Sequence, residues 1–131
     1  MNIGFDTIGN ATIIAYDNRP VIVTDPWFDG SPYFGSWTLS HTIPEEQRRA
    51  IAESEYVWIS HGHPDHLISD SLTQLREKKI LLPTHHNSRI YDDLLEEGYD
   101  VILLADNEWI QLSEHIRILC GQFSVSSDVF L

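Results

Sequence analysis

Positive charge and cysteine are both scarce in this sequence. Its 131 residues include 8 Lys and Arg against 20 Asp and Glu, which gives a net charge of −12. Such a chain repels polyphosphates and anionic membrane surfaces, so nucleic acid is not an expected partner. The single cysteine, Cys120, has no second thiol with which to form an internal disulfide, and this fits a reducing compartment.

Long apolar runs are missing as well. No stretch approaches the roughly 18 apolar residues that a membrane-spanning helix needs, and the first ten residues lack the basic start and apolar core of a secretory signal. We therefore expect a cytoplasmic protein with no membrane span. The length predicts one domain over residues 1–131, or the N-terminal part of a larger one.

The N-terminal third is predicted to be β structure followed by a long loop. Apolar, β-prone residues at 11–16 and 20–25 flank a turn and predict a hairpin, preceded by a short strand at 3–8. The hairpin places Asp25 at its exit. Residues 26–40 are rich in Gly, Pro and aromatic side chains, which predicts a structured loop over a surface or pocket.

The remaining sequence alternates helices and strands, which predicts an α/β fold with a mixed sheet. Helices are predicted over 44–53, from an N-cap at Ser69 to about Lys78, and from a cap at Asn87 to Gly98. Strands are predicted at 56–60, 80–84 and 100–104, with a meander completed by 108–113 and 115–120. Residues 127–131 begin one more strand, which looks cut rather than finished, and its exposed edge predicts self-association.

Three histidines and an aspartate lie within "HGHPDH", residues 61–66, directly after the apolar segment at 56–60. The carboxyl ends of strands in open α/β sheets are common ligand sites. Residues two apart in an extended loop project to one side, so His61 and His63 can bind one cation. Asp65 and His66 can then bind a second. Imidazoles with a carboxylate suit zinc, manganese or iron.

Two adjacent cations would make hydroxide available near neutral pH, and Asp65 could orient it as a catalytic residue. The alternative is a solvated turn in which Asp65 lies near the N-terminus of the following helix. A Ser-His-Asp triad around Ser60 is disfavoured because the chain has no Gly-x-Ser-x-Gly sequence.

The segment "HGHPDH" resembles the His-x-His-x-Asp-His motif of the metallo-β-lactamase superfamily, and "VIVTDPW" resembles its first motif. Within the superfamily, "DPWFDG" and "ISHGHPDHL" are most similar to the branch of ascorbate-6-phosphate lactonase, N-acyl-phosphatidylethanolamine phospholipase D and CMP-N-acetylneuraminate hydroxylase. The resemblance implies an αβ/βα sandwich, of which this chain supplies about half. It also implies two zinc ions, one on His61 and His63 and one on Asp65 and His66, with Asp25 supporting the loop.

The resemblance also implies a third histidine for the first metal, but Phe123 stands at the corresponding position. Asp128 is an alternative ligand there. The main functional prediction is a metal-dependent hydrolase that acts on an ester, lactone, amide or phosphodiester bond of a small molecule. The alternatives are a dinuclear iron oxygenase on the same scaffold and a truncated fragment without catalysis.

Other residues carry two interpretations each. His85 and His86 follow a predicted strand, where they could contact substrate or cap the next helix. Trp27 belongs to a group of aromatic residues after Asp25 that could wall a substrate pocket or pack the loop as a small core. His41 and His115 are predicted to be structural and exposed, respectively.

Overall fold

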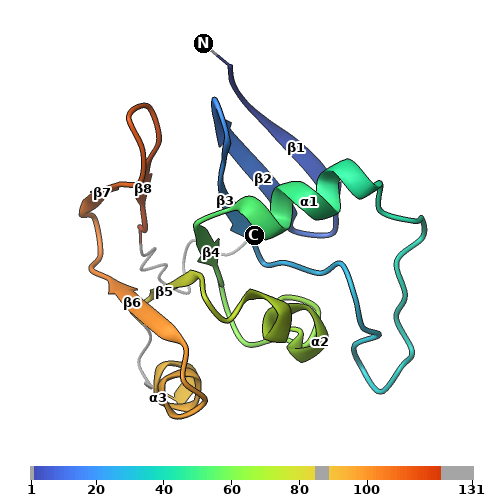
Figure 1. Ribbon diagram of the computed structural model, residues 1–131. Helices are drawn as coiled ribbons and strands as arrows, with labels where there is room; N and C mark the ends of the chain where they lie inside the picture. The colour runs from blue at the N-terminus through green and yellow to red at the C-terminus, as the bar shows by residue number, and fades with distance from the viewer. Residues whose placement is uncertain (1, 85–88, 122–131) are drawn as a thin grey trace, which may run out of the picture.

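A computed structural model of the protein describes residues 2–84 and 89–121. One sheet has six strands in the order β1-β2-β3-β4-β5-β6, and a separate two-stranded sheet pairs β7 with β8 (Figure 1). The strands are β1 (Ile3–Gly9), β2 (Thr12–Asp17), β3 (Pro20–Thr24), β4 (Tyr56–Trp58), β5 (Lys79–Pro83), β6 (Asp100–Leu104), β7 (Trp109–Gln111) and β8 (Arg117–Leu119). The helices are α1 (Glu45–Glu53), α2 (Ser69–Leu72), the 3₁₀ turn η1 (Thr73–Leu75) and α3 (Arg89–Glu96).

The sheet is mixed, as predicted. β1, β2 and β3 pair antiparallel, whereas β3, β4, β5 and β6 pair parallel. Each parallel connection passes through helical segments, as parallel strands require. The β2–β3 turn is tight because Asn18 adopts a left-handed backbone conformation with φ 60°, which asparagine tolerates better than most residues.

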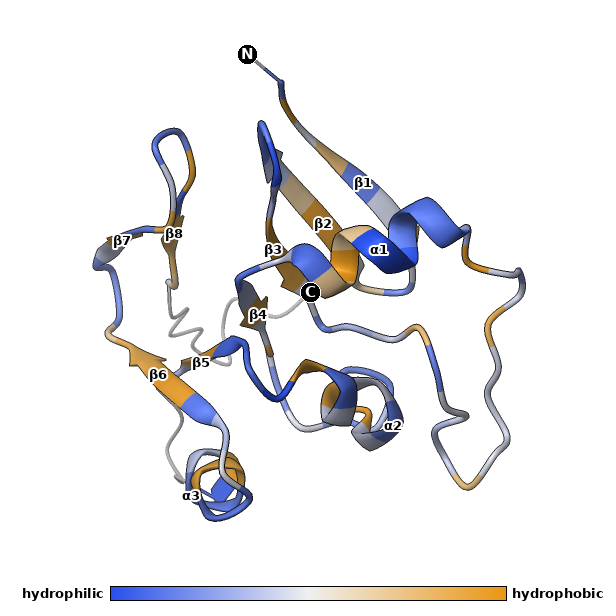
Figure 2. Cartoon of the chain, viewed as in Figure 1, coloured by the Kyte–Doolittle hydropathy of each residue, from blue (hydrophilic) through white to orange (hydrophobic). Residues whose placement is uncertain are grey.

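The two faces of the six-stranded sheet bury different cores. The larger core lies under the helices, where Val57, Ile80 and Leu82 meet Ile51 of α1 and Leu94 of α3. The smaller core contains Val21, Leu81 and Leu104 and is packed by residues of the β7–β8 hairpin. Apolar residues therefore concentrate on the central strands and the inner sides of the helices (Figure 2). Strands buried on both faces read as continuous apolar runs in the sequence.

Two predictions of secondary structure were wrong. The helix predicted from Ser69 to about Lys78 is one turn of α-helix followed by a 3₁₀ turn that ends at Leu75, and Ser69 is its first residue rather than its cap. The predicted meander is also absent from the described residues, because β7 pairs with β8 and neither joins β6. The cap predicted at Asn87 and the strand predicted at 127–131 lie outside the described residues.

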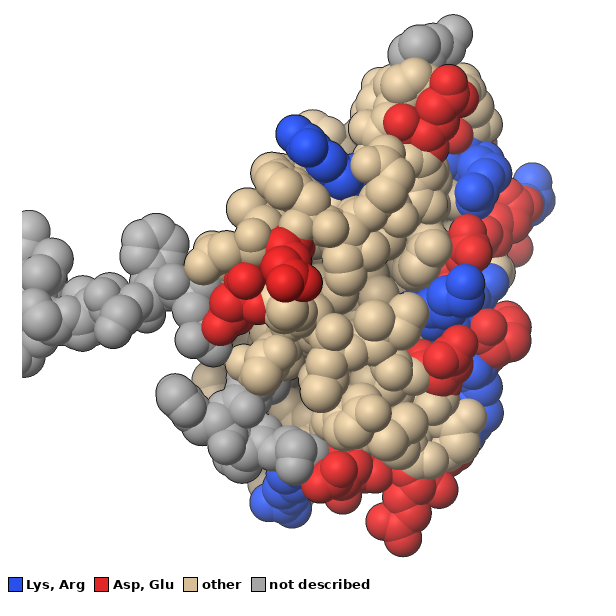
Figure 3. All heavy atoms as spheres, turned by 90° about the vertical axis from the view of Figure 1, so that its left-hand side faces the viewer, with Lys and Arg blue, Asp and Glu red and all other residues tan. Residues whose placement is uncertain are grey.

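The surface carries its charge unevenly. Figure 3 shows a broad area with few charged side chains, ringed by acidic and basic residues, on the side where β6, β7 and β8 lie. Leu103, Trp109 and Leu119 of these strands are exposed. Within residues 2–84 and 89–121, no helix is long and apolar enough to cross a membrane.

Candidate metal centre

The "HGHPDH" loop, residues 61–66 and called the metal loop below, leaves the sheet at the carboxyl end of β4, beside the carboxyl end of β3. These two strands are parallel neighbours, so Asp25 and Ser60 emerge at the same edge. The Asp25 amide donates to the Trp58 carbonyl over 2.7 Å, which joins the two exits. The amides of His66 and Leu67 both donate to the His63 carbonyl over 2.9 Å and close a turn. The topology therefore brings together two sequence motifs that lie 35 residues apart.

Asp25 is the polar centre of this edge. Its side chain is buried, with 4% of the residue exposed, and it accepts three hydrogen bonds. Oδ1 accepts from the Ser60 amide over 2.7 Å, while Oδ2 accepts from the Ser60 hydroxyl over 2.6 Å and from His66 Nδ1 over 2.9 Å. The Asp25 backbone has φ 36°, a left-handed conformation that Asp and Asn tolerate. The Asp25 carboxylate thus ties the loop to the end of β3 through Ser60 and His66.

These contacts fix which nitrogen of two imidazoles carries the proton. His66 Nδ1 must donate, because its partner is a carboxylate oxygen. The Ser60 hydroxyl gives its only proton to Asp25, so at 2.8 Å it must accept from His61 Nδ1. Neutral His61 and His66 therefore both present an unprotonated Nε2. A hydrogen bond at one ring nitrogen that directs the other is typical of metal-binding histidines.

The four predicted ligands form two pairs with suitable separations. His61 Nε2 lies 3.0 Å from His63 Nδ1, and His66 Nε2 lies 3.3 Å from Asp65 Oδ2. Two ligand atoms at about 2.1 Å from one metal ion are about 3.0–3.4 Å apart at octahedral or tetrahedral angles. The rings of His61 and His66 are also close, with centroids 4.1 Å apart. The donor chemistry and the spacing fit two metal ions, each with two of its ligands.

Neither pair is a complete site. Among the described residues, no group of three or more His, Cys, Asp and Glu side chains has the arrangement of a metal centre. A protein-bound zinc or iron usually has at least three protein ligands. Phe123 and Asp128, considered above as the third position of the first metal, lie outside the described residues. A complete centre would need further ligands from outside the described residues.

Electrostatics keep His61 and Asp65 in the forms that bind cations. Burial lowers the pKa of His61, and the nearby imidazoles of His66 and His63 lower it further. Burial alone would raise the pKa of Asp65, but hydrogen bonds from Asn10 and Tyr33 outweigh it and hold that pKa below its usual range. The site therefore favours a neutral imidazole and an ionised carboxylate, the protonation states in which these groups bind metals.

Asp65 is held by Tyr33, one of the aromatic residues after Asp25, and by Asn10, which the sequence analysis did not single out. The Tyr33 hydroxyl donates to Oδ1 over 2.8 Å, and Asn10 Nδ2 donates to Oδ2 over 3.1 Å and to the Asp65 carbonyl over 3.2 Å. The hydrogen bond to Asp65 is the main reason that the pKa of Tyr33 is raised. Asn10 has φ 51°, so an asparagine in the β1–β2 turn was the one local signal available, and it indicates a turn rather than a site.

The side chains of the aromatic loop, residues 26–40, are divided between the core and the surface. Trp27 and Phe28 are buried, and the Trp27 indole donates to the Gly30 carbonyl over 3.0 Å. Phe34 and Trp37 are exposed, and Trp37 packs on the Tyr33 ring at 4.7 Å. This burial favours the core interpretation at the start of the loop, and contact of Trp27 with substrate stays a prediction. A shallow groove of about 430 Å³ remains beside it, lined by Gly9, Asn10, Trp27, Ser36, Trp37, Thr38, Leu39, Ser40 and His41.

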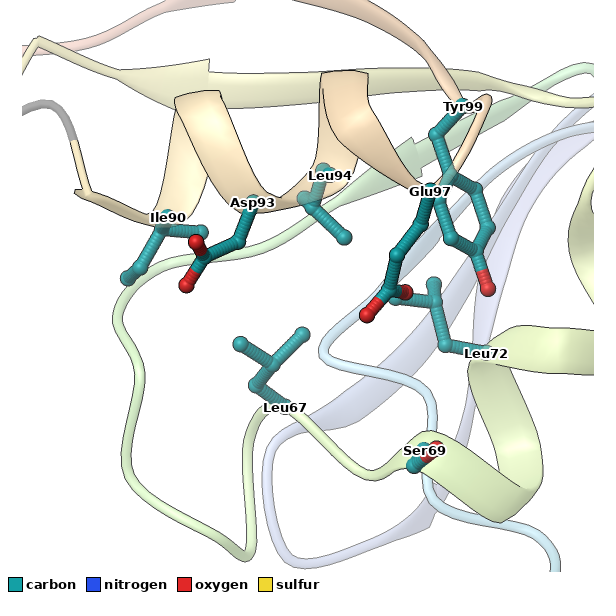
Figure 4. Close-up of a pocket in the computed structure, with 8 residues that line it drawn as sticks. All are labelled: Leu67, Ser69, Leu72, Ile90, Asp93, Leu94, Glu97 and Tyr99. Atoms are coloured by element: carbon teal, nitrogen blue, oxygen red, sulfur yellow. The ribbon is translucent and has the colours of Figure 1, made fainter.

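The back of the metal loop packs against α3. A side chain at Gly62 would come within 2.9 Å of Ile90 Cδ1, so this glycine permits close packing rather than an unusual backbone angle. A cavity of about 210 Å³ lies next to that contact, between α3 and α2 (Figure 4). Leu67, Leu72 and Leu94 line it, together with Asp93 and Glu97. None of the four predicted metal ligands lines this cavity.

The other predicted histidines lie elsewhere. His85 and His86 lie outside the described residues, so their contact with substrate stays a prediction. His115 is exposed, as predicted, but it also has a partner: its Nδ1 lies 2.9 Å from Asp17 Oδ1. Its amide and the Ser113 hydroxyl bind Asp17 as well. These contacts attach the β7–β8 hairpin to the β2–β3 turn, at the last residue of β2. The first residue of β2, Thr12, lies at the opposite end of the strand, where its hydroxyl donates to the Asp25 carbonyl.

No protein-family model matches the sequence. Curated relatives are nevertheless found. The cytidine monophosphate-N-acetylneuraminic acid hydroxylase of Cricetulus griseus is 31% identical over 104 residues, which are 75% of this chain and 18% of the relative. The enzyme of the same name from Danio rerio is 28% identical over 101 residues, 72% of this chain and 17% of the relative. The chain thus spans less than a fifth of the length of these relatives.

A solved structure agrees with this result. A mutant of the CmlA beta-hydroxylase superposes with a TM-score of 0.57 at 20% sequence identity, covering 86% of this chain and 23% of that one. The chain has part of a metallo-β-lactamase-like fold. The resemblance carried by "HGHPDH" is therefore confirmed at the level of the fold.

The comparisons support the predicted fold but not the predicted reaction. Both the curated relatives and the solved structure are named as hydroxylases. The prediction of an enzyme scaffold agrees with these names, whereas the main prediction of hydrolysis and the choice of zinc find no support in them. The oxygenase alternative fits the comparisons better than the hydrolase.

Proposed function

We propose that this chain provides the first metal ligands of a hydroxylase that uses two iron ions. The observation that carries the proposal is the arrangement of the metal loop, in which two ligand pairs have metal-compatible separations of 3.0 and 3.3 Å. The names of the relatives support hydroxylation as the reaction. Because the chain spans under a fifth of those relatives, the activity belongs to a protein that supplies the remaining ligands.

The residues have separate roles in this proposal. His61 and His63 hold one iron, and Asp65 and His66 hold the other. Asp25 orients His66 directly and His61 through Ser60. Iron in a site of imidazoles and carboxylates activates dioxygen for the oxidation of C–H bonds. Zinc has no redox chemistry, so the same ligands filled with zinc would not support a hydroxylase.

The substrate proposed is a small molecule rather than a nucleic acid, in keeping with the net charge of −12. The groove beside Asn10 and Trp37 is linked to Asp65 through Asn10, which lines the groove and binds that carboxylate. Its aromatic and hydroxyl side chains suit a molecule with both ring and polar groups. The name of the curated relatives makes cytidine monophosphate-N-acetylneuraminic acid the first compound to test. A cytoplasmic location stays a prediction from the sequence.

The test uses the full-length protein, purified from cells without added metal, with His63→Ala and His115→Ala as a matched pair of variants. His115 pairs with the carboxylates of Asp17 and Glu114 and not with a residue of the metal loop, so it controls for the loss of any imidazole. Metal content is measured by plasma mass spectrometry. After anaerobic loading with Fe²⁺, substrate and oxygen are added and a single turnover is measured as oxygen consumed and hydroxylated product formed. The two ferrous ions supply the two electrons that reduce the second oxygen atom to water.

The proposal expects about two iron ions per molecule of the full-length protein in the wild type and in His115→Ala, with a clear loss in His63→Ala. Oxygen consumption coupled to product should follow the iron. Two zinc ions together with hydrolysis of an ester or lactone, and no oxygen consumption, would overturn the hydroxylase in favour of the hydrolase. A wild type without stoichiometric metal would refute both functions.

A further inference from the structure

The segment that carries Tyr33 has an unusual backbone. Tyr33 and Phe34 have φ 56° and 58°, and Gly35 follows with φ 83°. Glycine adopts this left-handed region freely, but bulky residues are rarely found there, and two in succession cost free energy. Strain of this kind persists only where surrounding contacts hold it, and it concentrates at functional sites.

Hydrogen bonds within the segment hold its backbone, and the Tyr33 side chain extends from it to Asp65. The Gly35 amide donates to the Ser31 carbonyl over 3.0 Å, and both the amide and hydroxyl of Ser36 donate to the Tyr33 carbonyl. The Tyr33 ring packs on Trp37, and its hydroxyl reaches Asp65 Oδ1. The left-handed turn therefore directs the Tyr33 side chain into the site while the neighbouring Phe34 side chain remains fully exposed.

The two oxygens of Asp65 have different surroundings. Oδ1 receives the Tyr33 hydroxyl, whereas Oδ2 receives Asn10 and lies 3.3 Å from His66 Nε2. A carboxylate with Oδ1 fixed in this way cannot rotate freely, and Oδ2 stays beside the imidazole nitrogen that would share its metal ion. Partners that orient a metal ligand contribute strongly to metal affinity.

We propose that Tyr33 is a positioning residue for the second metal, holding Asp65 so that Oδ2 faces the same ion as His66 Nε2. This inference rests on the proposed function, because it requires that Asp65 bind metal. It assigns the aromatic loop a role in assembling the metal centre. The role belongs to the hydroxyl group and not to the ring.

The test is a Co²⁺ titration of the full-length protein, followed by visible absorption and with no substrate present. The central variant is Tyr33→Phe, which keeps the ring and its packing on Trp37. The matched control is Tyr16→Phe, because the Tyr16 hydroxyl binds the Asp6 carboxylate over a similar 2.9 Å on β1 and β2, away from the loop. An Asp65→Asn variant identifies which binding event involves Asp65.

We expect Tyr33→Phe to weaken that event about 10–100-fold and to leave the other event unchanged. Tyr16→Phe should titrate like the wild type. In the Asp65→Asn background the further change Tyr33→Phe should have almost no effect, since the hydroxyl acts only through that carboxylate. Thermal melts of each variant accompany the titrations, so a general loss of structure would be seen as a loss of both events.

Two results would overturn the inference while leaving the proposed function intact. One is a Tyr33→Phe protein that binds both Co²⁺ ions as the wild type does. The other is a loss of affinity that persists at full size in the Asp65→Asn background, or that affects both events equally. A wild-type protein that binds no Co²⁺ would overturn the proposed function, and this inference with it.

Discussion

Replacing Asp25 with asparagine tests the central claim about the metal loop. Asparagine has nearly the same shape and tolerates the φ of 36° at this position, so the backbone should not change. Its amide oxygen can take the place of Oδ1 and accept from the Ser60 amide. Its NH₂ group then occupies the place of Oδ2, where the Ser60 hydroxyl and His66 Nδ1 both donate to Asp25.

The amide reverses the direction of these hydrogen bonds. His66 Nδ1 must now accept, which moves the proton to Nε2, and the Ser60 hydroxyl turns to donate to His61 Nδ1, which moves that proton as well. Three charge-assisted hydrogen bonds become neutral ones, at a loss of about 1 kcal/mol each, so the free energy of unfolding should fall by about 3 kcal/mol. Metal affinity should fall about 10–100-fold because both Nε2 atoms become protonated.

Two measurements check this prediction. Urea unfolding gives the free energy, and long-range ¹H–¹⁵N NMR reports which nitrogen of His61 and His66 carries the proton. Asp29→Asn is the matched control, since Asp29 lies in the same loop but its side chain is 42% exposed and pairs with Arg48. That control should change stability by no more than about 1 kcal/mol. Unchanged tautomers in Asp25→Asn, with a loss below about 1 kcal/mol, would refute the account of the site.

Three further predictions concern the framework around the site. Gly62→Ala should destabilise the protein by about 1 kcal/mol, because the new side chain would come within 2.9 Å of Ile90 Cδ1. In the Ile90→Val background, which lacks that atom, most of this cost should disappear. Equal losses of unfolding free energy with Ile90 and with Ile90→Val, measured by urea unfolding, would contradict this prediction. Ser71→Ala should lower the free energy of unfolding by about 2–4 kcal/mol in the same assay, because the amides of Phe28 and Asp29 both donate to the buried Ser71 hydroxyl and its removal leaves them unpaired. An unchanged free energy would mean that water replaces the hydroxyl. The hydrogen bonds from Ser113 and His115 lower the pKa of Asp17 from 3.8 to about 2, so their contribution to stability is present above pH 3.8 and is lost as the pH falls toward 2. Asp17 in turn raises the pKa of His115 above 6.5. That contribution to stability is present below pH 6.5 and is lost as the pH rises through the raised pKa. The difference in thermal midpoint between the wild type and His115→Asn should therefore be largest between pH 3.8 and 6.5, and a difference independent of pH would argue against the ion pair.

Local sequence signals predicted most elements correctly where those signals are strong. The hairpin, the strands β4, β5 and β6 and the helix α1 appear at the predicted places, because apolar runs and turn residues act over a few positions. The helix after Ser69 was predicted too long. Its apolar residues Leu72 and Leu75 fit a helical period, but the chain tightens into a 3₁₀ turn to bring Leu75 into the core, which is a tertiary effect.

The sequence by itself determined the chemistry that this protein can carry. Three histidines and an aspartate in six residues, placed after a buried strand, offer nitrogen and oxygen donors of the kind that suit zinc, manganese or iron. Only the tertiary structure decided how those residues are held. The parallel pairing of β3 and β4 brings Asp25 to Ser60 and His66, and the loop turn brings Tyr33 to Asp65 across 32 positions of the chain. Such contacts depend on strand order and backbone strain, which no local pattern records, because their energies come from groups that meet only after the chain has folded.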